Sequence, residues 1–340
     1  MQRSFWLRLS KWEFLPFWLF YFPVYFYWLW LGIRARSLVF FSAANPLMEM
    51  GGFCGYSKSN VLKHLPGKFI PQTQILELTA DNVSTVAHTI EENFLFPLIV
   101  KPDVGERGWK VEKIHTKEEL ILYLSQNQGK LIVQEYIDYP LEFGVMYSRL
   151  PGQAKGKITS MVQKEFLSVV GDGKSTLAEL FHHSKRTRYY EDTLLHLYKD
   201  ELHIILPEHK KKELVSIGNH CRGTTFLNAN HLITPDLLSV FDQISKQISG
   251  FYFGRYDLRV PSLEDLYAGK NIKILELNGA NSEPAHIYDP QMSIVSAYKH
   301  LFSHWNNLFE ISIRNHKEGI PFMSFREGLD TIRNRKLYNK

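Results

Sequence analysis

The chain has 340 residues, of which 44% are hydrophobic and 22% charged, and this composition excludes a disordered or fibrous protein. Residues 1–36 carry most of the net charge of +5, so the rest of the chain is near neutral, which argues against a nucleic-acid-binding protein. Cys54 and Cys221 have no partners at metal-ligand spacing. We therefore expect neither a disulfide framework nor structural zinc, and a reducing cytoplasm fits the sequence.

An aromatic segment without charge runs from Phe14 to Ile33 and is long enough to cross the core of a bilayer. Pro16 and Pro23 should interrupt a helix, and Trp and Tyr prefer the headgroup interface. We therefore expect the protein to be cytoplasmic and peripheral on the inner face of a membrane, with residues 5–33 touching its surface. The alternatives are packing against the body of the protein or against a second subunit, as in a homodimer.

After Ser37, β-rich runs alternate with amphipathic helical patterns, which is typical of an α+β or α/β enzyme. One helix should begin at Thr116, which forms a capping box with Glu119, and another at Pro235. The last two strands should form an antiparallel pair. The predicted strands are 37–41, 97–101, 110–114, 130–137, 142–149, 156–166, 251–260 and 271–279.

Three oxygen-bearing side chains lie on the last two predicted strands. Glu276 and Asn278 are two residues apart, so they point to one face of the sheet, where Asp257 on the neighbouring strand can join them. Carboxylate and amide oxygens suit Mg²⁺, with water and nucleotide completing its shell. The alternative is a solvated polar hairpin.

Residues suited to a nucleotide come earlier in the chain. Lys101 ends the strand FPLIVKP and can reach a phosphate, and the backbone at Gly105 and Gly108 can approach phosphate oxygens closely. Glu135 and Glu142 follow the strand KLIVQ, and their carboxylates can accept hydrogen bonds from the adenine amine and the sugar hydroxyls.

The motifs FPLIVKP, VQEYIDYPLEF, GRYDLR and ILELNGANS resemble those of the ATP-grasp superfamily of carboxylate-amine ligases, over about residues 50–305. They follow in the same order as in D-alanyl-D-alanine ligases and in the ligase half of cyanophycin synthetases. The resemblance implies an α+β ATP-grasp fold, in which two α+β subdomains clamp ATP, with a shortened N-terminal region. The implied divisions are a pre-ATP-grasp remnant at 37–57, the ATP-grasp domain at 58–310 with its lid at about 97–150, and a tail at 311–340.

The resemblance also implies roles for single residues. Lys58 and Lys101 would contact phosphate, and Arg255 would hold the acyl phosphate and the tetrahedral intermediate. Two Mg²⁺ ions, or Mn²⁺, would be bound by Asp257, Glu276 and Asn278. ATP would also contact Gly105, Gly108, Gln134, Glu135, Tyr136, Ile137 and, at its ribose, Glu142.

The segment GNHCRGT resembles a loop of the glutamate ligases that tail a ribosomal protein, which makes Asn219 and Arg222 candidates for metal or phosphate contact. Further candidates for substrate contact are Arg259, Ser282 and His286. The implied activity joins a carboxylate substrate to an amine substrate through an acyl phosphate. The alternatives are an ATP-grasp enzyme with a non-amine acceptor and an ATP-binding, membrane-associated protein without ligase activity.

Overall fold

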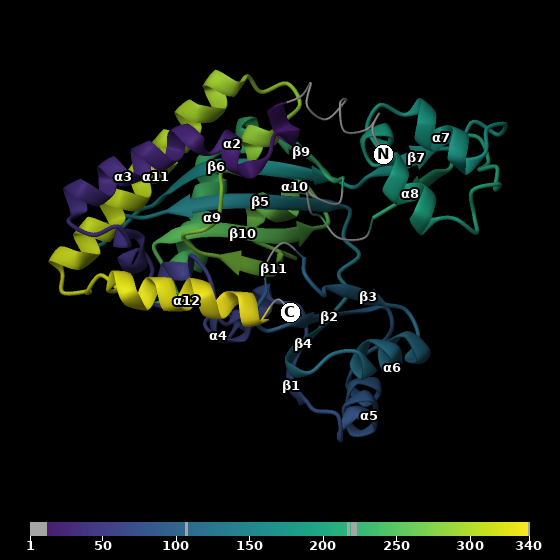
Figure 1. The fold of residues 1–340 in the computed structure, drawn as a ribbon, viewed down its shortest axis with the longest axis horizontal. Helices are drawn as coiled ribbons and strands as arrows, with labels where there is room; N and C mark the ends of the chain where they lie inside the picture. Colours follow the sequence, from purple (N-terminus) through teal and green to yellow (C-terminus); the bar gives the residue numbers. More distant parts are fainter. Residues whose placement is uncertain (1–11, 106–107, 216–217, 219–222, 339–340) are drawn as a thin grey trace.

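The computed structural model describes residues 12–105, 108–215, 218 and 223–338, and Figure 1 shows how they are arranged. Two antiparallel sheets of four and five strands each carry helices, and a small two-stranded sheet forms a third unit. The predicted α+β fold with two α+β subdomains is confirmed.

The four-stranded sheet has the order β1-β4-β2-β3. Its apolar side chains pack with those of two helices around one core, which includes Ile90, Leu98 and Leu120. The strands are β1 (Thr73–Leu78), β2 (Leu98–Pro102), β3 (Glu112–Ile114) and β4 (Gly129–Glu135), and the helices are α5 (Val83–Asn93) and α6 (Lys117–Ser125).

The five-stranded sheet has the order β11-β10-β5-β6-β9. Alternation along its central strands gives it two unlike faces, since Tyr256 packs in the core with Phe241 of a helix, whereas Arg255 and Asp257 point to the opposite face. Its elements are β5 (Leu141–Ser148), β6 (Lys157–Glu165), β9 (Thr225–Asn228), β10 (Phe253–Val260), β11 (Lys273–Asn278), α9 (Pro235–Lys246) and α10 (Leu263–Ala268).

The third unit has a core of its own, which includes Leu177, Phe181 and Leu194. It lies beside β6 and β9 in Figure 1, away from the smaller of the two main sheets. Its elements are β7 (Ser168–Val170), α7 (Leu177–His183), α8 (Glu191–Leu197) and β8 (Lys211–Glu213).

Helices from both ends of the chain complete the fold. Near the N-terminus, α2 (Phe17–Phe20) and α3 (Phe22–Ala35) lie along α11 (Ile294–Lys317), and α12 (Phe325–Tyr338) runs below β11 in Figure 1. Phe20 and Val24 pack with Leu301 of α11, so one face of the aromatic segment does pack against the body of the protein.

The prolines of this segment begin helices instead of interrupting one, because Pro16 is the N-cap of α2 and Pro23 lies in the first turn of α3. The opposite face of the segment is exposed, with Trp18, Phe26 and Ile33 each more than half accessible to solvent. Among the described residues, no helix is both long enough and apolar enough to cross a membrane.

The predicted strand at 37–41 is wrong, because Phe40 begins a 3-10 helix in which it and Phe41 are both buried. The range of 97–150 predicted for a lid contains strands of both main sheets, since β5 pairs with β10, and the lid itself stays a prediction. The remaining short helices are α4 (Lys58–Leu62) and the 3-10 helices η1 (Trp12–Phe14), η2 (Phe40–Ala43), η3 (Glu49–Gly52), η4 (Gly67–Phe69), η5 (Thr187–Tyr189), η7 (Asn230–Leu232) and η8 (Ala285–Tyr288).

Candidate functional site

A cavity of about 1130 Å³ is lined by residues of both main sheets and of the helices at the chain ends. It gathers most of the site residues predicted from the sequence. His286 does not line the cavity, and Asn219 and Arg222 lie outside the described residues. The predicted residues that line it are Lys58, Lys101, Gly105, Gly108, Gln134, Glu135, Tyr136, Ile137, Glu142, Arg255, Asp257, Arg259, Glu276, Asn278 and Ser282.

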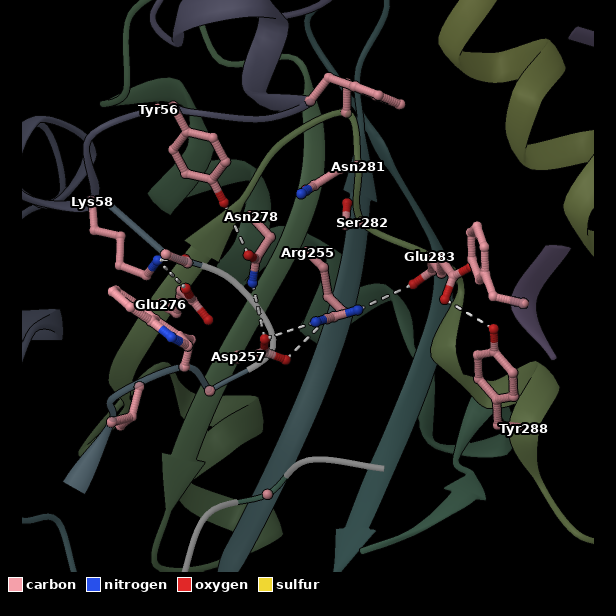
Figure 2. A pocket seen from close by; sticks show the side chains of 18 of the residues that line it. Tyr56, Lys58, Arg255, Asp257, Glu276, Asn278, Asn281, Ser282, Glu283 and Tyr288 are labelled. Carbon is pink, nitrogen blue, oxygen red and sulfur yellow. Dashed lines mark hydrogen bonds and ion pairs between the residues drawn. The ribbon is translucent and has the colours of Figure 1, made fainter. Parts of the chain in front are cut away.

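The three predicted metal ligands meet on β10 and β11. Asp257 lies opposite Glu276 in the antiparallel register, and the Asn278 amide nitrogen donates to Asp257 Oδ2 at 3.0 Å. The Tyr56 hydroxyl donates to Asn278 Oδ1 at 3.0 Å (Figure 2). The predicted grouping of these three side chains on one face of the sheet therefore agrees with the geometry.

Asp257 is paired with two cations. Arg255 Nε donates to its Oδ1 at 3.0 Å and Nη2 to its Oδ2 at 2.9 Å, and Lys164 Nζ lies 3.3 Å from Oδ1. Burial works to raise the pKa of Asp257, but Arg255 and Lys164 outweigh it and lower the pKa to about 2. The carboxylate therefore stays ionised at neutral pH, and Arg255 is held in a fixed orientation.

Lys164 was not predicted as a site residue, although it bridges two that were. Its Nζ also contacts Glu142 Oε1 at 3.0 Å, and its side chain is buried. Burial lowers the pKa of Lys164, but the two carboxylates outweigh it, so the net shift is upward. A lysine inside the predicted strand 156–166 was the available signal, because a buried lysine needs a charged partner.

Arg259 lies at the nucleotide side of the predicted site and not at the acceptor side. Its Nε donates to Glu142 Oε2 at 2.8 Å, and its Nη1 donates to the Ile137 carbonyl at 2.6 Å. Glu142 therefore already has two cationic partners, and a ribose there would share its oxygens with Arg259 and Lys164. Arg259 connects Glu142 to the chain segment predicted to hold adenine.

The two predicted phosphate-contacting lysines come from different elements. Lys58, in the first turn of α4, donates to the Gly105 carbonyl and lies 3.6 Å from Glu276. Lys101, at the end of β2, is buried and donates to the Leu275 carbonyl at 3.1 Å. Burial lowers the pKa of Lys101 to about 8, with Glu276 opposing the shift and Lys58 adding to it.

Asp103 fixes the position of Lys58 and was missed in the sequence. It accepts hydrogen bonds from the Ser59 backbone at 2.7 Å and from the Ser57 hydroxyl at 2.8 Å, and Ser57 is itself the N-cap of α4. Asp103 follows β2 directly, so this contact ties the start of α4 to the strand that carries Lys101.

The loop after β11 forms the side of the cavity that was predicted to contact the acceptor. Ser282 donates to the Gly279 carbonyl and lines the cavity, as predicted. His286 is buried elsewhere, with Nδ1 at 2.6 Å from Ser160 Oγ, and burial lowers its pKa to about 4. The structure therefore gives His286 a place in the core, in contrast to the predicted substrate contact.

An all-oxygen donor set of two carboxylates and an amide fits Mg²⁺ or Mn²⁺. Within the described ranges, no group of three or more His, Cys, Asp or Glu side chains is placed to hold a metal. A metal here would therefore depend on Asn278 and on phosphate and water oxygens, in addition to Asp257 and Glu276. Next to it, Lys58, Lys101 and Arg255 supply positive charge along one wall of the cavity.

The chain is similar to a ligase family over part of its length, and the solved structures that it resembles include ligases. The model of the tubulin-tyrosine ligase family matches residues 54–144, and no curated protein sequence matches the chain. The matched stretch contains Lys58, Lys101 and Glu135, so the family match supports the predicted superfamily over the segment predicted to bind the nucleotide.

Three solved structures illustrate the matches. D-alanine–D-alanine ligase from Bacillus anthracis is 18% identical, with 80% of this chain and 72% of that chain covered and a TM-score of 0.45. VanG D-Ala:D-Ser ligase from Enterococcus faecalis is 14% identical, with 77% and 64% covered and a TM-score of 0.43. A bifunctional glutathione synthetase from Pasteurella multocida is 16% identical, with 72% of this chain but 36% of that chain covered and a TM-score of 0.38.

Proposed function

We propose that this protein is an ATP- and Mg²⁺-dependent ligase, which activates a substrate carboxylate as an acyl phosphate and joins it to an amine. The observation that carries the proposal is the convergence of Lys58, Lys101, Arg255 and the acidic pair Asp257 and Glu276 on one cavity between two sheets. Transfer of a phosphoryl group requires positioning and charge neutralisation more than covalent chemistry from the protein.

The lysines bind the phosphates of ATP. Lys101, with its pKa of about 8, is mostly protonated at pH 7, and its burial strengthens its attraction for phosphate oxygens. Lys58 is held at the start of α4 and faces Glu276, so it reaches the same part of the cavity from the other side. The bound metal, held by Asp257, Glu276 and Asn278, would neutralise charge on the phosphates.

Arg255 holds the oxygens of the acyl phosphate and of the intermediate formed when the amine attacks. Its planar guanidinium can contact two oxygens at once, and its pairing with Asp257 removes the need to reorganise during the reaction. Loss of one such preorganised donor typically lowers the rate by about 10² to 10³.

The test is ADP release from Mg-ATP with pools of carboxylates and amines, with hydroxylamine added to trap any acyl phosphate as a hydroxamate. We expect a hydroxamate with one pool, and we expect Arg255→Ala and Glu276→Ala each to lower the rate of ADP release by at least about 10². Lys117→Ala is the matched control, because Lys117 is an exposed charge on the smaller sheet's helix α6.

The outcomes separate this proposal from its alternatives. ADP release with a hydroxamate but without any amide product would indicate a non-amine acceptor. ATP binding without ADP release in every pool would favour a nucleotide-binding protein without ligase activity. Unchanged turnover in either alanine variant would show that the assigned residues are wrong.

A further inference from the structure

The cavity extends past the proposed phosphate site into an apolar region formed by both ends of the chain. Its lining there includes Tyr21, Val24 and Trp28 from the N-terminal helices and Phe325, Leu329 and Ile332 from α12. We call this region the apolar chamber. The whole cavity, at about 1130 Å³, exceeds the usual size of a site for one small ligand, which leaves room for more than a nucleotide.

The residues of the terminal helices that line the chamber recur at helical spacing, so each helix presents one face to it. On α12 the lining positions are 325, 328, 329 and 332, and on α2 and α3 they are 17, 20, 21, 24, 25 and 28. Both sets follow the spacing of one helical face. Phe325 is 54% exposed and Ile332 is 37% exposed, so the α12 side of the chamber is open to solvent, whereas Tyr21 and Val24 on the other side are buried.

A carboxylate lies where the chamber meets the proposed catalytic residues. Glu283 accepts hydrogen bonds from the hydroxyls of Tyr21 and Tyr288, the latter at 2.9 Å, and its backbone carbonyl accepts from Arg255 Nη1 at 3.4 Å (Figure 2). Burial raises the pKa of the Glu283 carboxyl to about 7, with the Tyr288 hydrogen bond opposing the shift. Glu283 therefore lies between Arg255 and the aromatic wall.

We propose that the chamber binds an amphipathic primary amine, whose ammonium group contacts Glu283 and whose long apolar part fills the space between α3 and α12. This inference rests on the proposed ligase function and names the class of its acceptor. The ionised form of the Glu283 carboxyl suits an ammonium group, which in turn favours that form, whereas Arg255 on the other side suits the anionic acyl phosphate.

The reaction step is balanced as follows. Glu283 takes one proton from the ammonium group, and the nitrogen lone pair then forms a bond to the carbonyl carbon of the acyl phosphate. The bond from that carbon to the phosphate oxygen breaks, and phosphate leaves with the second proton of the nitrogen. A base whose pKa lies near the working pH suits this role.

The test is a fluorescence titration with two dansyl-labelled diamines, one with twelve and one with five methylene carbons. We expect the longer diamine to bind at least about tenfold more tightly, since each buried methylene group contributes to binding. Leu329→Trp should fill the chamber and weaken the longer diamine by at least about tenfold. Asp330→Trp, an exposed neighbour on the same helix, should leave it unchanged.

Glu283→Gln tests the polar end. It should weaken the longer diamine by about tenfold and leave a dansyl-labelled twelve-carbon alcohol unaffected, because only the amine carries a charge. Equal binding of the two diamines, or equal effects of Leu329→Trp and Asp330→Trp, would overturn the inference. The titration needs no turnover, so its success without any hydroxamate would contradict the ligase proposal alone, and its failure beside a hydroxamate would contradict the chamber alone.

Discussion

Replacement of Glu283 by glutamine should change how the stability of the protein depends on pH. The pKa of Glu283 is raised from 4.5 to about 7 in the folded protein, and in the unfolded chain it returns to the ordinary value. Between these two values the unfolded chain gives up the proton and the folded protein keeps it. The free energy of unfolding of the wild type therefore falls as the pH rises through this range.

The magnitude follows from the size of the shift. Each pKa unit corresponds to about 1.4 kcal/mol, so a rise in pH from 5 to 8 removes about 3 kcal/mol through Glu283. The neighbours keep their charge state over this range, because Arg255 stays protonated and burial lowers the pKa of His304, on the same cavity, to about 3. Tyr21 and Tyr288 contact Glu283 as hydrogen-bond donors.

The assay is urea unfolding of the wild type and Glu283→Gln at pH 5 and pH 8. We expect the variant to gain about 3 kcal/mol relative to the wild type between the two values. Glu264→Gln removes a similar carboxylate from an exposed position on α10 and should change the difference by less than about 1 kcal/mol. A difference between wild type and Glu283→Gln that does not vary with pH would refute the reasoning.

Three more predictions follow from other parts of the fold. Lys164→Met should lower the free energy of unfolding by about 1 to 3 kcal/mol, because Asp257 and Glu142 each lose one of two cationic partners and keep an arginine. Lys164→Arg should lose less, and equal losses in urea unfolding would contradict this. Leu31→Ala should cost about 2 to 5 kcal/mol, since Leu31 is fully buried, and thermal unfolding measures the loss. We propose that the exposed face of α3 contacts a lipid surface. The double variant Phe26→Asp and Ile33→Asp should then lower the fraction of protein that cosediments with anionic vesicles at least about tenfold. An unchanged bound fraction would rule the contact out.

The acidic group on β10 and β11 could be predicted because strands have a period of two. Residues 276 and 278 must share a face, and antiparallel pairing of the two strands was expected from the polar connection between them, in which the structure places α10. Lys101 could be predicted in the same way, because the local sequence shows that it ends an apolar strand. These predictions required no knowledge of contacts between distant segments.

The missed residues depend on such contacts. Lys164 reaches Asp257 only because β5 lies between β6 and β10, and nothing in the local sequence of β6 fixes that order. His286 follows the predicted metal ligands in sequence, yet the 3-10 helix η8 turns it into the core toward Ser160. The secondary structure of residues 37–41 was misassigned for another reason. A short apolar stretch that is buried on all sides shows neither the periodicity of a helix nor that of a strand.

The residues that line the two halves of the cavity therefore differ in how far they can be recognised from the sequence. The proposed ATP half uses charged residues whose types and spacing follow from phosphate and metal chemistry, so its motifs are recognisable. The apolar chamber uses aromatic and aliphatic side chains, which any core would also use, and they come from opposite ends of the chain. The packing of α3 against α11, with α12 on the β11 side of the larger sheet, brings both ends of the chain to the cavity that Arg255 also lines (Figure 1). If the proposed ligase function holds, the terminal helices select the acceptor, while the motifs supply the activation chemistry.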